Sequence, residues 1–204
     1  MLAIVDCGIG NVSNVINAFN YIGVKCILTR DPFELSSARG LVLPGVGAFG
    51  ECVTRLEYHN LTATLASLVS TGMPLLGICL GFQLLMRSST EMGYHLGLDL
   101  VSSEVIQLPV TAPIPHVGWA QVKLQPHQES ESLLMAGLNK EYFYFVHSYG
   151  AIKPPAGAIS AFTSYSGCDF VSMIEFKNIF GTQFHPEKSG EPGLQLLNNF
   201  WGVC

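Results

Sequence analysis

Hydrophobic residues in the first half of the chain follow two patterns, one typical of buried strands and one typical of amphipathic helices. Short apolar runs predict four strands, at Leu2–Asp6, Val24–Leu28, Gly40–Leu43 and Pro74–Ile78. The segments between and after them predict helices over 12–22, Glu51–Tyr58, Leu61–Ser70 and Leu80–Arg87. Strands that alternate with helices favour a parallel sheet covered by helices on both faces.

The second half of the chain changes to short β-rich runs with short connections. Strands are expected at Leu100–Leu108, Trp119–Leu124, Glu141–Ile152, Ala158–Tyr165, Phe170–Phe176 and Ile179–Gln183, and a last helix at Gly193–Phe200. The expected fold class is therefore α/β, with a doubly wound, mostly parallel central sheet and added antiparallel strands. Because no linker, repeat or low-complexity tract divides the sequence, residues 1–204 are expected to form a single domain.

The composition argues against several classes of function. The 204 residues carry 10 Lys and Arg against 15 Asp and Glu without a basic run, so nucleic acid is not expected as a partner. No apolar stretch approaches the ~20 residues that span a bilayer, and the amino terminus lacks a basic leader. Only 12% of the residues are charged, which indicates that a partner covers part of the surface.

The six cysteines show no CxxC pair and no metal-ligand spacing. This pattern favours reduced, mostly buried thiols in a cytoplasmic protein. No metal and no organic cofactor is indicated.

Cys79 is the one cysteine whose surroundings favour chemistry over packing. It is the centre of a G-x-C-x-G pattern, Gly77–Gly81, between a predicted strand and a predicted helix, which is the context of a nucleophile elbow. The glycines leave room at a sharp turn, and a helix amino terminus favours the thiolate. The backbone N–H of Leu80 is then placed as half of an oxyanion hole. A buried structural thiol is the alternative, and it is the better interpretation for the other five cysteines.

A thiol nucleophile needs a base and a group that orients the base. His185 follows a predicted strand and precedes Pro186, so it is expected at a strand end, where Glu187 can turn back towards the imidazole. The other histidines lie in polar surroundings or lack a carboxylate nearby in the sequence. A structural histidine at the strand end is the alternative interpretation of His185.

A third segment, Leu43–Gly50, follows a predicted strand and is rich in glycine. Ligands of parallel sheets bind at the carboxyl ends of the strands, so this segment is expected on the same edge as Cys79. Gly45 and Gly47 allow peptide orientations that other residues avoid, so an N–H here can supply the second oxyanion donor. A phosphate-binding loop or a merely tight loop explains the segment alone equally well.

Taken together, these segments resemble those of the class I glutamine amidotransferases, which use a Cys-His-Glu triad. The general features of that family are Gly77–Gly81 and His185–Glu187. Narrower matches resemble the branch of the family that serves histidine biosynthesis, and they occur in the expected order at Asp6–Asn11, Pro44–Phe49, Pro115–Trp119, Phe145–Tyr149 and Gln183–Gly190.

The resemblance implies that Cys79 attacks the side-chain amide of L-glutamine, that His185 carries the proton, and that Glu187 orients His185. The implied oxyanion hole is formed by Val46 and Leu80, and the implied substrate-binding residues are Gly47, Gln83, Glu91, Ser148 and Tyr149. Four positions match residues that face a partner, a (β/α)8-barrel cyclase that receives the ammonia within a heterodimer: Asn11, Tyr144, His147 and Lys188.

Three alternatives remain open from the sequence. The same glutaminase can serve a cyclase-like partner in surface-sugar biosynthesis, because the chain departs from the family at Cys7, Ser13, Phe82 and Ala120. A stand-alone cysteine hydrolase of the dienelactone-hydrolase type also uses an elbow, but its triad acid precedes the histidine, whereas Glu187 follows His185. The third is a catalytically silent binding subunit, against which the intact Cys79, His185 and Glu187 argue.

Overall fold

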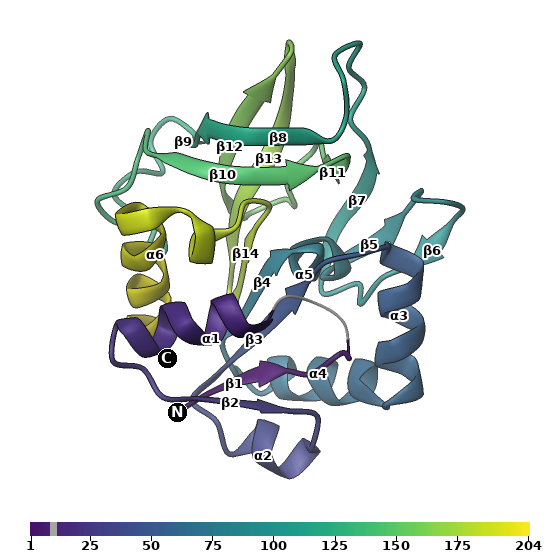
Figure 1. The fold of residues 1–204 in the computed structure, drawn as a ribbon, viewed down its shortest axis with the longest axis vertical. Helices are drawn as coiled ribbons and strands as arrows, with labels where there is room; N and C mark the ends of the chain where they lie inside the picture. The colour runs from purple at the N-terminus through teal and green to yellow at the C-terminus, as the bar shows by residue number, and fades with distance from the viewer. Residues whose placement is uncertain (9–11) are drawn as a thin grey trace.

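The computed structural model describes residues 1–8 and 12–204 as a mixed sheet flanked by helices (Figure 1). The strands are β1 (Leu2–Val5), β2 (Cys26–Thr29), β3 (Gly40–Gly45), β4 (Leu75–Cys79), β5 (Met86–Ser89), β6 (His95–Leu96), β7 (Val101–Gln107), β8 (His116–Gln121), β9 (Lys123–Leu124), β10 (Tyr142–His147), β11 (Tyr149–Ala151), β12 (Ile159–Tyr165), β13 (Cys168–Phe176) and β14 (Ile179–Thr182). The helices are α1 (Val12–Tyr21), α2 (Pro32–Ser36), α3 (Phe49–Tyr58), α4 (Leu61–Ser70), α5 (Leu80–Leu84), α6 (Gly190–Val203) and the 3-10 turn η1 (Pro186–Lys188). Within the described residues, none of these helices is both long enough and apolar enough to cross a membrane.

Eight strands form the central sheet, in the order β2-β1-β3-β4-β14-β13-β12-β9. The pairings from β2 to β14 are parallel, and those from β14 to β9 are antiparallel. Strands β10 and β8 form a separate ribbon, and β11-β7-β5-β6 form a third sheet. The predicted α/β class, with antiparallel strands added to a parallel sheet, is confirmed.

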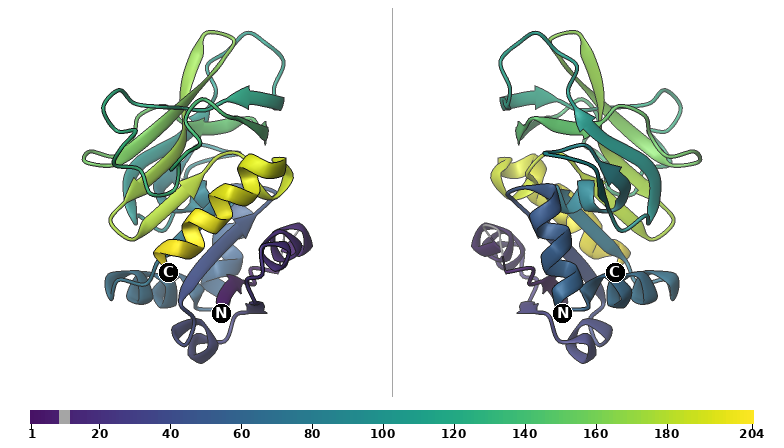
Figure 2. Two further views of the ribbon diagram at one scale, coloured as in Figure 1. Left: turned by 90° about the vertical axis from the view of Figure 1, so that its left-hand side faces the viewer. Right: turned by 90° about the vertical axis from the view of Figure 1, so that its right-hand side faces the viewer.

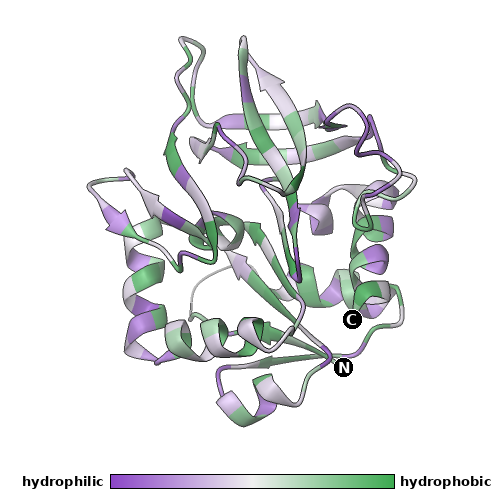
Figure 3. Ribbon diagram, turned by 180° about the vertical axis from the view of Figure 1, so that it is seen from behind, coloured by the Kyte–Doolittle hydropathy of each residue, from purple (hydrophilic) through white to green (hydrophobic). Residues whose placement is uncertain are grey.

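Side chains alternate between the two faces of β1, and the alternation divides the core into two parts. Leu2 and Ile4 belong to the part that includes α1 and α6, whereas Ala3 and Val5 belong to the part that includes α2, α3 and α4. Figure 2 shows α6 over one side of the sheet and α3 over the other, and Figure 3 shows apolar residues concentrated on the strands between them. This double cover explains why the parallel strands are continuously apolar in sequence.

The predicted helix Leu80–Arg87 is shorter in the structure. It ends at Leu84, and the chain continues as β5. The backbone N–H groups of Leu98 and Leu100 donate to the carbonyl oxygens of Leu84 and Leu85 at 2.8 and 2.9 Å. A segment distant in sequence therefore takes the carbonyl groups that a longer helix would use.

The predicted strand Glu141–Ile152 is two strands. Strand β10 pairs with β8, while β11 pairs with β7 in a different sheet, so the chain changes sheets at Ser148. The change of sheet places Ser148 and Tyr149 at the edge of the cavity described below.

Candidate active site

Cys79 lies at the junction of a strand and a helix, as the elbow pattern predicts. It is the last residue of β4, and α5 begins at the next residue. Its backbone has φ 55° and ψ −108°, a conformation that costs a non-glycine residue about 1–3 kcal/mol. Such strain at a strand end is typical of a side chain that is held out of the sheet for chemistry.

The two glycines of the pattern are required by close backbone contacts. A Cβ on Gly81 would lie 1.8 Å from the carbonyl oxygen of Leu43, and a Cβ on Gly77 would lie 2.7 Å from the Cα of Phe82. Any side chain at either position would push the turn away from β3 or from its own helix. The glycines therefore let α5 begin directly at the edge of the sheet.

His185 and Glu187 follow β14, the strand next to β4 in the sheet. Thr182 is paired with Ile78, so the residues just beyond β14 lie beside Cys79. The Nδ1–H of His185 donates to Oε1 of Glu187 at 2.8 Å, and the two side chains are only 2% and 4% exposed. A buried carboxylate that accepts from Nδ1 fixes the ring orientation and leaves Nε2 for the thiol.

The protonation of His185 is governed by its two partners. Burial lowers the pKa of His185, but the neighbouring Cys79 and Glu187 outweigh burial and raise the pKa to about 10. The imidazolium form is therefore favoured at neutral pH. A protonated imidazole beside the nucleophile can give its proton to a leaving group.

Cys79 and His185 line a cavity of about 290 Å³. Its lining also contains all five predicted substrate-binding residues and both predicted oxyanion residues: Gly47, Gln83, Glu91, Ser148, Tyr149, Val46 and Leu80. A larger cavity of about 460 Å³ lies by β5 and β7, where Arg87, Glu104 and Lys153 are exposed. The smaller cavity is the better candidate because it joins a strained thiol to a buried histidine and carboxylate.

The loop after β3 lies directly opposite the nucleophile. Gly45 is paired with Cys79 across the sheet, and Val46 and Gly47 follow at the cavity. Gly47 has φ 110°, a conformation that favours glycine. Glu91 reaches the same region, where its Oε2 accepts from the backbone N–H of Phe49 at 2.7 Å. The carboxylate of Glu91 is thereby fixed at the amino terminus of α3.

Two of the four predicted partner-facing residues lie together on the surface. The Nζ of exposed Lys188 lies 6.0 Å from the ring centre of Tyr144, whose ring lies 6.1 Å from that of Trp119. Asn11, together with Ile9 and Gly10 of the matched segment Asp6–Asn11, is outside the described residues.

His147 differs from the expectation that it faces a partner. Residues 143, 145 and 147 of β10 point inwards, so the His147 side chain is only 6% exposed. Its Nδ1–H donates to the carbonyl oxygen of Tyr149 at 2.8 Å, and it lines the cavity. His147 therefore holds the cavity wall from inside the protein, and its side chain is not presented to a partner.

Gln183 was not singled out as a functional residue in the sequence, although it lies in a matched segment. It is fully buried, and its Nε2 donates to the sulfur of Cys79 at 3.8 Å. The signal that could have found it is the strand register, because the residue after Thr182 must lie opposite the residue after Ile78. The residues described here contain no group of three or more His, Cys, Asp or Glu side chains that could hold a metal ion.

The fold and the site together define a class of protein, and comparison with known sequences agrees. The family described as glutamine amidotransferase class-I matches residues 3–203, so the chain belongs to the class I glutamine amidotransferases. A curated relative, imidazole glycerol phosphate synthase subunit HisH of Methanothermobacter thermautotrophicus, is 47% identical over 98% of this chain and 97% of its own. The subunit of the same name from Chlorobium luteolum is 42% identical over 98% of both chains.

A solved structure shows the same fold at lower sequence similarity. The structure of PurLQS from Thermotoga maritima superposes with a TM-score of 0.76 at 18% identity, covering 99% of this chain and 97% of that one.

Proposed function

We propose that this chain is the glutaminase subunit of an imidazole glycerol phosphate synthase. The observation that carries the chemistry is the strained Cys79 beside the buried His185–Glu187 pair at a cavity of amino-acid size. The observation that carries the choice of pathway is the identity of 42–47% to relatives named as that subunit. The ammonia is then used to form imidazole glycerol phosphate and AICAR in histidine biosynthesis.

In the proposed mechanism, the Cys79 thiolate attacks the side-chain amide carbon of L-glutamine. The negative charge moves to the amide oxygen, which accepts from the N–H groups of Val46 and Leu80. The carbon–nitrogen bond then breaks while Nε2 of His185 gives its proton to the leaving ammonia. The glutamyl thioester is hydrolysed when His185 takes a proton from water, and glutamate leaves as the thiolate re-forms.

The remaining lining residues suit the amino-acid end of glutamine. The carboxylate of Glu91 is complementary to the ammonium group of the substrate. Gln83 and the residues Gly47, Ser148 and Tyr149 close the other sides of the cavity, where backbone N–H groups can hold the substrate carboxylate. The proposed site needs no metal and no organic cofactor.

The proposed partner is a (β/α)8-barrel cyclase that docks on the outward face of the β8–β10 ribbon. This face carries exposed apolar residues, with Val117, Trp119 and Tyr142 each more than half exposed. It is continuous with the cavity, because Val146 of β10 is both on this ribbon and in the cavity lining. Ammonia released at Cys79 would then have a short, covered path to the partner.

We also propose that residues 1–204 form one domain that works in the cytoplasm. Strands from both halves of the chain pair in the central sheet, where β14 lies next to β4. All six cysteines are free thiols, as suits a reducing compartment.

The glutaminase proposal predicts covalent labelling of one thiol by a chloroketone analogue of glutamine. Intact mass is expected to show one label per chain, and peptide mapping is expected to place it on Cys79, because only that thiol combines a binding cavity with a neighbouring base. Excess glutamine should protect against the label. No labelling, with or without a cyclase barrel, would favour the silent-subunit alternative, and labelling that glutamine does not prevent would favour a hydrolase of other specificity.

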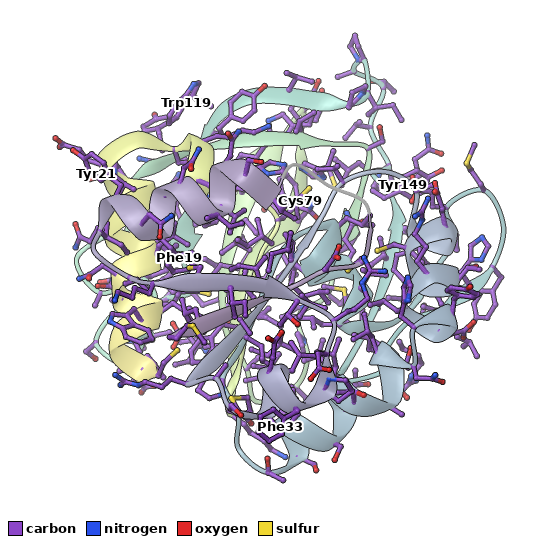
Figure 4. All side chains as sticks on the ribbon, turned by 60° about the horizontal axis from the view of Figure 1, so that its bottom comes forward. Phe19, Tyr21, Phe33, Cys79, Trp119 and Tyr149 are labelled. Carbon is purple, nitrogen blue, oxygen red and sulfur yellow. The ribbon has the colours of Figure 1, made fainter. Side chains whose placement is uncertain are left out.

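The partner proposal predicts that Trp119→Ala weakens binding of the cyclase by about 2 kcal/mol, roughly 30-fold, as is typical of a central aromatic anchor. Phe33→Ala is the matched control, since Phe33 is 78% exposed on α2, far from Trp119 (Figure 4). It should change the affinity less than twofold. The measurement is titration calorimetry with the barrel subunit. Equal affinities for both variants would show that the β8–β10 ribbon is not part of the interface.

A further inference from the structure

The sulfur of Cys79 has a neutral hydrogen-bond donor that the triad does not include. Gln183 is fully buried just beyond β14, where its backbone N–H donates to the carbonyl oxygen of Ser172 at 2.9 Å. Its side-chain Nε2 lies 3.8 Å from Sγ of Cys79, within hydrogen-bond range for sulfur. The side chain is thus held at the nucleophile by the same strand that leads to His185.

The direction of the Gln183 amide is fixed by its neighbour Gln83. The carbonyl oxygen of Tyr149 can only accept, so the group of Gln83 that faces it at 2.8 Å must be the Nε2 donor. The second hydrogen of this Nε2 is directed to Oε1 of Gln183 at 3.0 Å. With its oxygen turned to Gln83, Gln183 presents its NH₂ group to the sulfur.

The Tyr149 carbonyl that starts this chain of hydrogen bonds is itself held in place. It accepts a second bond from Nδ1–H of His147 at 2.8 Å, and Nε2 of His147 lies 3.3 Å from Nδ1 of His116. Burial lowers the pKa of His147 to about 4, so this ring is neutral at neutral pH and its Nε2 accepts. The Tyr149 carbonyl oxygen thus accepts from both His147 and Gln83. From Gln83 onwards each donor faces the next acceptor, and the series of hydrogen bonds ends at the Cys79 sulfur.

We infer that Gln183 is the donor that positions the Cys79 thiolate and stabilises its charge, with Gln83 setting the direction of the amide. An anionic sulfur accepts a hydrogen bond more strongly than a thiol does, so the contact favours the reactive form. The inference rests on the proposed glutaminase function, and it adds a group that the triad does not contain. Because an amide does not titrate, its contribution is present at every pH.

The test is the pH dependence of Cys79 alkylation by iodoacetamide, resolved by mass spectrometry of the peptide that contains Cys79. The titratable groups around the sulfur, namely His185, Glu91, His147 and Tyr149 in the cavity lining and Glu187 behind His185, are unchanged in the methionine variants. Gln183→Met keeps the length of the side chain but has no donor. It is expected to move the pH midpoint of alkylation upwards by about one unit.

Gln183→Glu replaces the donor by an acceptor. Glutamate has nearly the shape of glutamine and can still accept from Gln83, but it presents an oxygen to the sulfur. The midpoint should then shift upwards at least as far as in Gln183→Met, because the donor is lost and a carboxylate lies beside the thiolate. A packing role is separated by the Gln83 variant, for which it predicts a midpoint close to wild type. Gln83→Met, which keeps Gln183 but frees its amide to rotate, should give a smaller shift in the same direction. The control Gln195→Met, on the surface of α6, should give none.

The outcomes distinguish the inference from the proposed function. If wild-type Cys79 is protected by glutamine but the Gln183 variants keep its midpoint, the inference is overturned and the glutaminase stands. If wild-type Cys79 has no protection by glutamine, the function itself fails. A shift in Gln183→Met without one in Gln183→Glu also overturns the donor role.

Discussion

Cys79→Ser is expected to lower the rate of glutamine hydrolysis by the complex at least a thousandfold. A serine hydroxyl does not ionise near neutral pH, so the imidazolium of His185 would have no anionic nucleophile beside it. The replacement is nearly isosteric, and Cys79 is almost fully buried at 7% exposure, so the elbow should keep its shape. Glutamate release is measured for each protein, and thermal unfolding is measured in parallel to show that the fold is kept.

Cys168→Ser is the control for the loss of a thiol elsewhere. Cys168 begins β13 and is a free, partly exposed cysteine outside the cavity lining. Its replacement should change the hydrolysis rate by less than about twofold. A Cys79→Ser protein that melts like wild type and still hydrolyses glutamine at a comparable rate would exclude Cys79 as the nucleophile.

The elbow could be predicted from the sequence because its physical requirements are local. A short apolar strand, a central nucleophile and two glycines all lie within Gly77–Gly81, and each is visible without knowledge of the rest of the chain. The resemblance to the family implied that His185 acts with Cys79, but the strand order that brings them together was not predicted. The structure supplies it through the pairing of Thr182 with Ile78.

The features that the sequence missed depend on contacts between distant segments. The helix after Cys79 stops at Leu84 because residues 98–101 take its carbonyl groups, and nothing within 80–87 signals this. The inward position of His147 depends on the register of β10 against β8. The role inferred for Gln183 depends on the direction of one amide, which is set by Tyr149, more than 30 residues away in sequence.

The elbow is most sensitive to substitution at Gly81, where its backbone contacts strand β3. Strand β3 and the start of α5 approach so closely that the Cα hydrogens of Gly81 fill the space between them. Gly45, the residue before Val46, also lies directly against Leu80 and Gly81. The proposed oxyanion hole therefore depends on the absence of a side chain at position 81.

Gly81→Ala is accordingly expected to destabilise the protein by about 3 kcal/mol or more and to abolish labelling of Cys79 by the glutamine analogue. The added Cβ would lie 1.8 Å from the Leu43 oxygen and 2.7 Å from the Leu43 carbonyl carbon, and backbone atoms cannot rotate away as a flexible side chain can. For a chain of this size the loss corresponds to a fall in Tm of roughly 6–12 °C.

Gly202→Ala is the matched control for this prediction, because it makes the same chemical change where a Cβ meets nothing within 4 Å. Gly202 lies in the last turn of α6, where alanine is the better helix former, so its Tm should equal or slightly exceed that of wild type. Thermal unfolding and analogue labelling of the two variants are measured side by side. If Gly81→Ala melts within about 2 °C of wild type and still labels, the elbow does not depend on the close contact with β3, and the steric account of Gly-x-Cys-x-Gly in this chain is wrong.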